Sequence, residues 1–481
     1  MMNVSLISIV KEGTRGDLIR TLESLSSQPT VHWNWILVVE DKTSVLDVIR
    51  EFQKTSTHPL KHKIAVIVDT DLTAIRRINE QLSLMGSWIG FIEFGDFLSD
   101  EALPEMVNES EGYHILYSDE RHVSRWGWIS FINYKPGLNP HRLRFHNYLQ
   151  DLLLVRKSTL TAFGGFDETV TDDPMHDVIL KVLDAYGVSA FKHVSNILYS
   201  HQRKPLEPRS SDPREPEYIP QYDLQAIKLD LVRRGVPAVV EQIHGIPKHR
   251  LLIDEQPEVT AVVFLPDDLK TGRRILLELD SQDYPRLHVK AISRIKSVEY
   301  EQICKDLKFS YQKNQASEPT ILNEELSNTN SRLVLVLKGL PLGWDWLRDW
   351  IKETMQDYKI CAIGSKIFSG RTLTQPGIME WKYEGFDWNH RGRFSEIAVP
   401  HQVSMLSPVG VLINVSLWKK GEPFNENLPT YYMMEWGPQM DTKGYQLIYT
   451  PTVSVVTQTR VDSLEEFGLV EMSQDPYDLH G

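Results

Sequence analysis

Short apolar runs alternate with amphipathic stretches along the first hundred residues of the chain. The apolar runs, rich in Val, Ile and Leu, are typical of buried strands, and the amphipathic stretches have the spacing of surface helices. We predict strands at 4–10, 35–40, 64–68 and 88–93 and helices at 17–27, 45–55 and 75–85. This alternation indicates a Rossmann-like α/β fold, with a mainly parallel sheet and helices on both of its faces.

Acidic residues follow most of the predicted strands. Glu40 and Asp41 follow the second strand, Asp69 follows the third, and Asp96 follows the fourth. In sheets of this type, ligands bind at the carboxyl ends of the strands. We therefore expect these side chains to line one crevice.

The pattern of the first half begins again near residue 259. VTAVVFLPDD (259–268) parallels VSLISIVKEG (4–13), and the helical stretch after each run is also repeated. A repeat this long exceeds the period of solenoid proteins, about 50 residues at most, and indicates a tandem duplication of one domain. We predict domains at 1–250 and 258–481, with the segment 204–222, rich in Pro, Ser and charge, as an exposed arm.

Composition narrows the functional classes. The chain has 481 residues, of which 41% are hydrophobic, so it can bury the cores of several domains. Its formal net charge is −13 and it has no long basic run, which argues against binding to the phosphate backbone of DNA or RNA. We expect no nucleic-acid partner.

The two cysteines, Cys304 and Cys361, lack the spacing of a metal site or a disulfide framework, which fits a reducing compartment. No apolar run approaches the roughly 20 residues that span a bilayer. We therefore expect a cytoplasmic protein, with peripheral contact at the inner face of the membrane as the alternative.

Several motifs of the first half resemble family 2 glycosyltransferases, which have the GT-A fold. They are WNWILVVED (33–41), GSWIGFIEFGDFLSDEAL (86–103), LYSDE (116–120) and YKPGLNPHRLRFHNYLQDLLLVRKSTLTAFGGFDE (134–168). A fainter version follows in the second half, including GVLINVSLW (410–418) and KGYQLIYTP (443–451). The resemblance implies two tandem GT-A-like domains that use a nucleotide-diphosphate sugar.

A diphosphate leaving group needs a divalent cation to neutralise the charge that builds up as the glycosidic bond breaks. The Asp-x-Asp motif of the family falls on Glu93-Phe94-Gly95, with Asp96 next, and His201 lies near the place of a late histidine of the family. The resemblance thus implies that Glu93, Asp96 and His201 hold Mn²⁺ or Mg²⁺. The alternative is that the two carboxylates only end a buried strand and that the histidine is structural.

Four further acidic residues match positions that contact the nucleotide sugar. Glu40 and Asp41 fall on the acidic pair of the family at the end of the second strand, which implies contact with the base or ribose. Asp119 and Glu120, in LYSDE, match positions that line the donor pocket. The alternative is that all four are charges at turns.

An inverting enzyme also needs a base for the acceptor hydroxyl. The resemblance places Met175 at that position, and methionine cannot accept a proton. Asp173 and His176 are neighbouring candidates, as is Asp172. Asp177 is either a further candidate or a favourable charge at the start of a helix.

The second half departs further from the family. Lys338-Gly339 stands where a metal-binding pair would follow a strand, Met433 stands at the base position, and Val456-Thr457 replaces the late histidine. We therefore expect this domain to be a degenerate copy that does not catalyse metal-assisted transfer.

These observations favour an enzyme that transfers a sugar, with inversion, from a nucleotide-diphosphate donor to a glycan, a polysaccharide precursor or a lipid-linked glycan, with any activity in the first domain. Two alternatives stay open. One is a catalytically inactive scaffold or partner of another glycosyltransferase, which the methionine at the base position of both halves favours. The other is a glycan-binding module.

Overall fold

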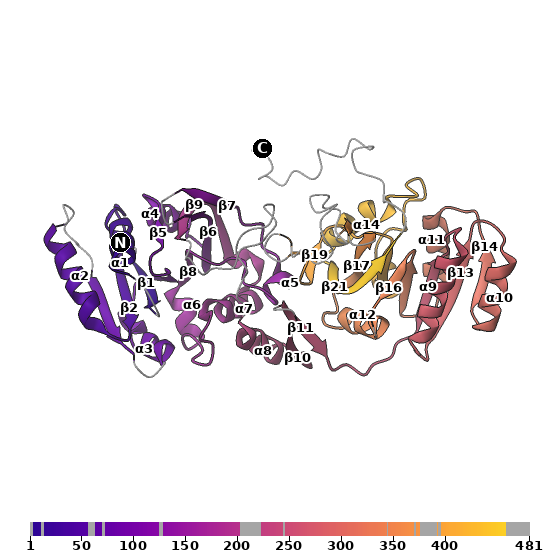
Figure 1. Ribbon diagram of the computed structural model, residues 1–481, viewed down its shortest axis with the longest axis horizontal. Coiled ribbons are helices and arrows are strands. Elements are labelled where there is room, and N and C mark those ends of the chain that lie inside the picture. The colour runs from indigo at the N-terminus through magenta and orange to yellow at the C-terminus, as the bar shows by residue number, and fades with distance from the viewer. Residues whose placement is uncertain are drawn as a thin grey trace. The chain divides into compact units, whose positions relative to one another are not determined.

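The computed structural model describes residues 3–10, 14–55, 63–69, 73–124, 128–202, 223–243, 246–343, 345–369, 372–375, 392 and 396–457. The predicted arm at 204–222 lies outside these residues. The chain divides into two compact units, Met1–Arg233 and Arg234–Gly481, each an α/β structure with helices packed on a sheet (Figure 1).

The first unit is built on one sheet with the strand order β3-β2-β1-β4-β8-β6-β9-β5, and β7 pairs with β6. Its strands are β1 (Asn3–Val10), β2 (His32–Val39), β3 (Lys63–Val68), β4 (Trp88–Phe91), β5 (Phe97–Leu98), β6 (Ile115–Val123), β7 (Ile129–Asn133), β8 (Leu153–Arg156) and β9 (Phe191–Gln202). Its helices are α1 (Arg15–Ser26), α2 (Lys42–Thr55), α3 (Ala74–Glu80), α4 (Ala102–Asn108), α5 (Pro140–Leu143), α6 (Lys157–Ala162), α7 (Pro174–Tyr186) and α8 (Leu224–Arg233). These bounds confirm the seven predicted elements of the first hundred residues.

The sheet of the first unit is mainly parallel, as predicted. The strands β3, β2, β1 and β4 run parallel, β8 is antiparallel to both β4 and β6, and β9 is parallel to β6. Since β5 is antiparallel to β9, all strands of the main path except β8 and β5 point the same way. The ends of β4, β6 and β9 therefore meet at one edge.

Helix α1 shows how the sequence specifies a local element. Thr14 and Asp17 form a capping box that satisfies backbone N–H groups at the first turn. Leu18, Leu22 and Leu25 then recur at helical spacing and are buried against the sheet. The buried face of α1 also carries Thr21, which reaches the turn after β4.

The second unit has its own sheet, in the order β14-β13-β12-β15-β20-β17-β21-β16, and a separate hairpin of β10 and β11. Its strands are β10 (Ala238–Ile243), β11 (Ile246–Leu251), β12 (Val259–Phe264), β13 (Leu287–Ser293), β14 (Ser310–Lys313), β15 (Leu333–Leu337), β16 (Leu340–Leu342), β17 (Ile360–Ser369), β18 (Thr372–Gln375), β19 (His401–Val403), β20 (Gly410–Asn414) and β21 (Gln446–Val456). Its helices are α9 (Leu269–Ser281), α10 (Val298–Asp306), α11 (Glu318–Asn328), α12 (Trp346–Thr354), α13 (Val415–Trp418) and α14 (Tyr432–Thr442).

The two sheets correspond strand for strand. Strand β12 of the second sheet corresponds to β1 of the first. The strands that follow in the second sheet are β15, β20, β17, β21 and β16, and they correspond in this order to β4, β8, β6, β9 and β5. Each neighbouring pair has the same parallel or antiparallel direction in both sheets. The side strand is also repeated, because β18 pairs with β17 as β7 pairs with β6. The predicted tandem duplication of one α/β fold is confirmed.

The hairpin of β10 and β11 lies with the second unit, which begins at Arg234. Lys248 on β11 approaches Asp349 on α12, with 3.6 Å between Nζ and Oδ2. None of the helices within the described parts of the chain is long and apolar enough to cross a membrane.

The predicted junction between the domains 1–250 and 258–481 can be tested by limited proteolysis. We expect the full chain to give two stable fragments of similar size, because each unit buries its own core. N-terminal sequencing of the larger fragments will show whether the cut follows β11 or precedes β10. A single resistant core that cannot be divided in either place would contradict the two-domain organisation.

Candidate functional site

The turn between β4 and β5 carries Glu93 and Asp96 at the carboxyl end of β4. Gly95 has a φ of +99°, a conformation that favours glycine, and its N–H donates to Thr21 Oγ1 at 3.2 Å. The Thr21 hydroxyl in turn donates to the carbonyl of Asp96 at 2.7 Å. Helix α1 therefore fixes the turn that presents the two carboxylates.

Asp96 is buried and is tied to the end of β9. Its Oδ2 accepts the hydroxyl of Tyr199 at 2.7 Å and lies 2.9 Å from His201 Nδ1, and its Oδ1 accepts the N–H of Gln202 at 2.8 Å. Burial, together with the carboxylates of Asp96, Asp151 and Glu93, raises the pKa of Tyr199 well above its usual value, so the phenol stays protonated. The Tyr199 oxygen also accepts the N–H of Glu93 at 3.1 Å.

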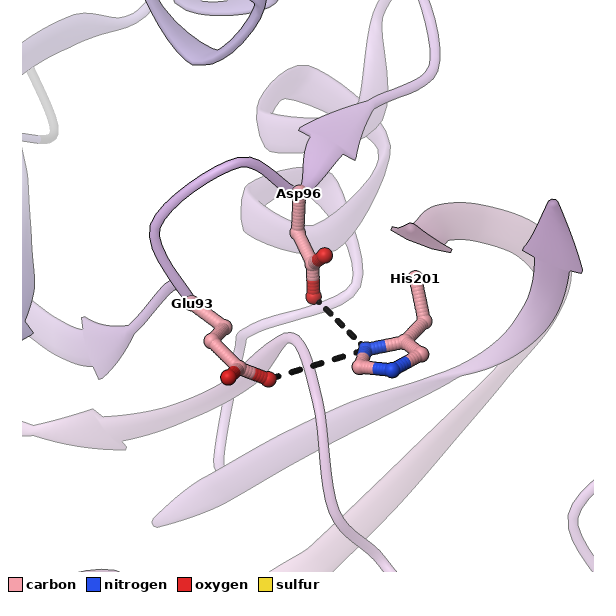
Figure 2. A group of neighbouring side chains, drawn as sticks. All are labelled: Glu93, Asp96 and His201. Carbon is pink, nitrogen blue, oxygen red and sulfur yellow. Dashed lines mark hydrogen bonds and ion pairs between the residues drawn. The ribbon is translucent and has the colours of Figure 1, made fainter. Parts of the chain in front are cut away.

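Glu93, Asp96 and His201 converge at this edge of the sheet, with both carboxylates directed toward the imidazole (Figure 2). One ligand atom from each lies within 4.8 Å of the others, and Glu93 Oε2 is 3.6 Å from His201 Nδ1. The side chain of Glu93 is 42% exposed, whereas those of Asp96 and His201 are 1% and 6% exposed. The cluster is thus fixed on its inner side and open to solvent at Glu93.

The donor atoms of this cluster suit a divalent cation. Carboxylate oxygens are ligands for Mg²⁺ and Mn²⁺, and an imidazole nitrogen adds preference for a transition metal. A cation between Glu93 and His201 would also offset the negative charge of the Glu93 and Asp96 carboxylates. The three residues that the resemblance implied as metal ligands are therefore brought together, and they fit such an ion.

Glu120 lies on β6 and forms an ion pair with a buried lysine. Lys135 is fully buried, and its Nζ lies 2.8 Å from Glu120 Oε2, while Asn133 donates to Glu120 Oε1 at 2.6 Å. Burial opposes ionisation of Glu120, but the Lys135 ammonium and His122 outweigh this effect and lower its pKa to about 2. Glu120 therefore stays ionised at neutral pH. Its neighbour His122 packs against His201, with 5.0 Å between ring centroids, and this contact places Glu120 near the cluster.

The same lysine holds the loop before β8. Its Nζ donates to the carbonyls of Leu149 at 2.7 Å, of Asp151 at 3.3 Å, and of Gln150. Asp151 and the following Leu152 have φ values of 43° and 33°, in the left-handed region. Sequence reasoning assigned no role to either Lys135 or Asp151, because neither the buried ion pair nor the backbone strain has a local signal.

Asp119 is buried and serves as an anchor. Its Oδ1 accepts the backbone N–H of Lys135 at 2.8 Å and lies 2.8 Å from His193 Nε2. The His193 ring stacks on Tyr117, with 4.7 Å between centroids. Asp119 thus positions the lysine that neutralises Glu120.

Glu40 and Asp41 follow β2 and are both exposed. In the sheet order β2-β1-β4, they lie at the same carboxyl edge as Glu93, with β1 between. Residues 11–13, which follow β1, lie outside the described residues. The exposed pair is accessible to a ligand that binds along this edge.

The side chains of the predicted base region are used by the fold. Met175 is buried on α7, and His176 Nε2 lies 2.6 Å from the carbonyl of Leu143. Asp173 caps α7 by accepting the N–H of His176 at 3.2 Å, and it also accepts Asn147 Nδ2 at 2.7 Å. These contacts orient α7, and each oxygen of the Asp173 carboxylate keeps a lone pair that could still accept a further hydrogen bond.

Asp177 is fully buried and doubly paired. Its Oδ2 lies 2.7 Å from Lys181 Nζ, one turn further along α7, and its Oδ1 lies 2.6 Å from Arg233 on α8. The pairing joins α7 to α8 and accounts for the acidic residue in the first turn of α7.

The register of the second sheet identifies the residues that replace this cluster. Val4 pairs with Trp88 and Val259 pairs with Leu333, while Arg156 and Asn414 take the same place on the antiparallel neighbour. Equivalent positions in the two units follow from these pairs and from the pairs of β17 with β20 and β21. The residues of the second unit are Lys338 at the position of Glu93, Gly339 at that of Asp96, Val409 at that of Asp151, Ile367 at that of Glu120 and Thr457 at that of His201.

Two of these replacements alter the local chemistry directly. Lys338 forms an ion pair with Glu318 and lies over the ring of Tyr432, 5.9 Å from its centroid. A Cβ at Gly339 would lie 2.5 Å from the carbonyl oxygen of Val456, so the backbone leaves no room for a side chain. The described part of the second unit therefore has an ammonium where the first has two carboxylates.

No family model matches the chain. Among curated proteins, it is 27% identical over 296 residues to the O-antigen biosynthesis protein RfbC of Myxococcus xanthus, covering 60% of this chain and 23% of that protein. It is 21% identical over 283 residues to the uncharacterized protein y4gI of Sinorhizobium fredii, covering 57% of this chain and 31% of that protein. The matched regions thus span less than a third of either relative.

Solved structures similar to the chain include TarS of S. aureus in complex with UDP, with 16% identity, a TM-score of 0.32 and coverage of 42% of this chain and 61% of that chain. Another is the mannosyltransferase PcManGT of Pyrobaculum calidifontis in complex with GDP-Man and Mn²⁺, with 15% identity, a TM-score of 0.31 and coverage of 42% and 57%. The chain itself has a mixed α/β architecture with two large, mostly parallel sheets that repeat one strand order.

Proposed function

We propose that the first unit is a glycosyltransferase. It transfers a sugar, with inversion, from a nucleotide-diphosphate donor to a glycan or polysaccharide precursor, either free or lipid-linked. The observation that carries the proposal is the cluster of Glu93, Asp96 and His201 at the carboxyl edge of the sheet. A related role for the M. xanthus protein in O-antigen biosynthesis supports a polysaccharide as the product.

In this proposal Glu93, Asp96 and His201 hold Mn²⁺ or Mg²⁺. When bound, the ion supplies positive charge to the diphosphate leaving group. Asp96 is kept in place by Tyr199 and by the backbone of Gln202, so the inner side of the site needs no rearrangement. Glu93, which is half-exposed, closes the site from the solvent side.

The exposed pair Glu40 and Asp41 contacts the base or ribose of the donor, since a nucleotide along the carboxyl edge extends from β4 past β1 to β2. Glu120, with its pKa of about 2, adds a fixed negative charge beside His122 and His201 in the donor pocket. Asp119 supports this wall by anchoring Lys135.

The second unit is a docking or positioning module in this proposal. Its Lys338 would repel a metal ion, and Val409 and Ile367 replace acidic residues of the first unit. Met433, at the position expected for a base, is buried and 1% exposed. The partner it positions is the acceptor glycan or another glycosyltransferase.

The proposal is tested by nucleotide binding to the full chain. We expect UDP, GDP or dTDP to raise the melting temperature in the presence of Mn²⁺, because a ligand at 100 times its Kd contributes about 2.7 kcal/mol. Glu93→Gln should abolish the metal-dependent part of the shift, since its side chain is exposed and its loss leaves the core intact. Glu80→Gln, an exposed residue of α3 paired with Arg76, is the matched control and should bind as the parent does.

If none of the three nucleotides raises the melting temperature, the alternative of an inactive scaffold is favoured. Its structural basis is the set of replaced residues in the second unit, together with Asp96, whose two oxygens are already hydrogen-bonded within the protein. If transfer is observed, a full chain that carries both Glu93→Ala and Asp96→Ala should have lost it. Metal-dependent turnover in that variant would place the chemistry in the second unit.

A further inference from the structure

Three buried hydroxyl groups converge on the turn between β4 and β5, which carries Glu93 and Asp96. They belong to Ser8 on β1, Thr21 on α1 and Tyr199 on β9, and these residues are 2%, 0% and 1% exposed. Three separate elements of the first unit thus contribute a hydroxyl to the same short turn.

Two of the hydroxyls each join two points of the turn. Tyr199 Oη accepts the backbone N–H of Glu93 at 3.1 Å and donates to Asp96 Oδ2 at 2.7 Å. Thr21 Oγ1 accepts the N–H of Gly95 at 3.2 Å and donates to the carbonyl of Asp96 at 2.7 Å. A hydroxyl can form both bonds because it is at once a donor and an acceptor.

Ser8 binds the start of the turn. Its Oγ donates to the carbonyl of Ile92 at 2.6 Å and accepts the indole N–H of Trp35 at 3.0 Å. Hydrogen bonds in such buried, low-dielectric surroundings are electrostatically stronger than in water. The three hydroxyls therefore fix the backbone that presents the two carboxylates.

The second unit has apolar residues in place of the hydroxyls. By the correspondence of β1 with β12, Val263 stands at the position of Ser8. By the correspondence of β9 with β21, Val455 stands at the position of Tyr199. Both valines are buried in the core of the second unit.

The helices α1 and α9 show the same replacement. Gln28 accepts the N–H of the second residue of α4 at 3.0 Å, and Gln282 accepts the N–H of the second residue of α12 at 3.3 Å. Counting back seven residues from each glutamine gives Thr21 and Ile275, and Ile275 is also buried in the core. The hydroxyls accompany the carboxylates of the first unit and are not a requirement of the fold.

We propose that Tyr199 and Thr21 are positioning residues of the metal site, with Ser8 supporting the start of the turn. They act through Glu93 and Asp96 and do not contact the ion themselves. This assignment rests on the proposed function, in which these carboxylates help to hold Mn²⁺ or Mg²⁺. Groups that orient the ligands of a metal ion typically contribute about 10-fold to 100-fold to its affinity.

The test is binding of Mn²⁺ alone to the full chain, measured by titration calorimetry and by loss of the EPR signal of free Mn²⁺. Tyr199→Phe removes the hydroxyl and keeps the ring, and Thr21→Val replaces the hydroxyl with a methyl group. We expect each change to raise the Kd for Mn²⁺ about 10-fold to 100-fold. The aliphatic residues at the equivalent positions of the second unit indicate that both variants should fold, which circular dichroism will check.

Two further variants are matched controls. Thr21→Ser keeps the hydroxyl and should bind Mn²⁺ as the parent does. Tyr449→Phe removes a similarly buried hydroxyl in the second unit, where it donates to the carbonyl of Ile397 at 2.9 Å. This variant loses a buried hydrogen bond away from the metal site, so its Kd for Mn²⁺ should not change.

If the hydroxyls only hold the fold together, Tyr199→Phe and Thr21→Val will melt earlier but keep a Kd within about threefold of the parent, and the assignment is overturned. Loss of Mn²⁺ binding in Glu93→Gln in the same experiment would leave the proposed metal site intact in that case. Equal weakening in Thr21→Ser and Thr21→Val would also overturn the assignment, because the effect would not follow the hydroxyl. A parent chain that does not bind Mn²⁺ would overturn both this assignment and the metal site on which it rests.

Discussion

Replacing Lys135 with methionine should lower the free energy of unfolding by about 3–5 kcal/mol, because it leaves Glu120 charged and buried without a partner. The ammonium is fully buried, and besides Glu120 it binds the carbonyls of the loop before β8. Methionine fills a similar volume, so the loss reflects the charge more than a cavity. The effect is measured by urea denaturation of the parent and the variant at pH 7.

The pH dependence of this effect has a definite sign. In the folded parent, Glu120 has a pKa of about 2, whereas in the unfolded chain its pKa is about 4.3. Its stabilising contribution is therefore fully present above about pH 4.3 and is lost as the pH falls toward 2. Without the ammonium, burial raises the pKa of Glu120, and protonation relieves the penalty. The deficit of Lys135→Met should therefore be larger at pH 7 than at pH 4.

A matched control is Lys192→Met, whose lysine pairs with Glu109 at 2.9 Å on the surface. Exposed pairs contribute about 0–1 kcal/mol, so this variant should unfold close to the parent. Equal losses in the two variants, or a deficit for Lys135→Met that does not change with pH, would contradict the role assigned to the buried ammonium.

Replacing Asp177 with alanine should also be costly for stability, by about 2–4 kcal/mol, because Lys181 and Arg233 would lose their shared partner between α7 and α8. Nucleotide binding, measured below the melting temperature, should remain. Glu168→Ala, at an exposed residue in the loop before α7 that has no role in the proposed site, provides the control. A variant with unchanged stability and turnover reduced about 100-fold would instead identify Asp177 as the base.

The parts of the fold that depend on local pattern were predictable from the sequence. Apolar runs gave β1 to β4 to within a few residues, and the restart at Val259 gave the duplication, since buried strands and amphipathic helices have their own periods. Glu93, Asp96 and His201 followed from the resemblance, although residues 96 and 201 are distant in the sequence. The structure brings them together because β5 pairs with β9.

The role of Lys135 was not predictable, because a lysine in a loop stretch is most often exposed. Its burial depends on carbonyls and a carboxylate contributed by two other segments. Asp151 was missed for a related reason. Its left-handed backbone is imposed by tertiary contacts, and aspartate before an apolar run resembles an ordinary turn. Prediction from spacing therefore identified residues at strand ends and missed Lys135 and Asp151, which lie in loops.

Because of Lys338, the two copies differ in the source of the positive charge at the end of the strand that follows β1 or β12 in the sheet. In the proposed function, the cation held by Glu93, Asp96 and His201 in the first unit comes from solution, so its occupancy would follow the supply of metal. In the second unit the balancing charge is covalently attached and already paired with Glu318. If the first unit binds metal as proposed, chelation or metal starvation would act on that half of the chain and leave the other half unchanged. On this proposal, the duplication would combine in one polypeptide a unit whose state depends on metal supply and a unit whose state does not.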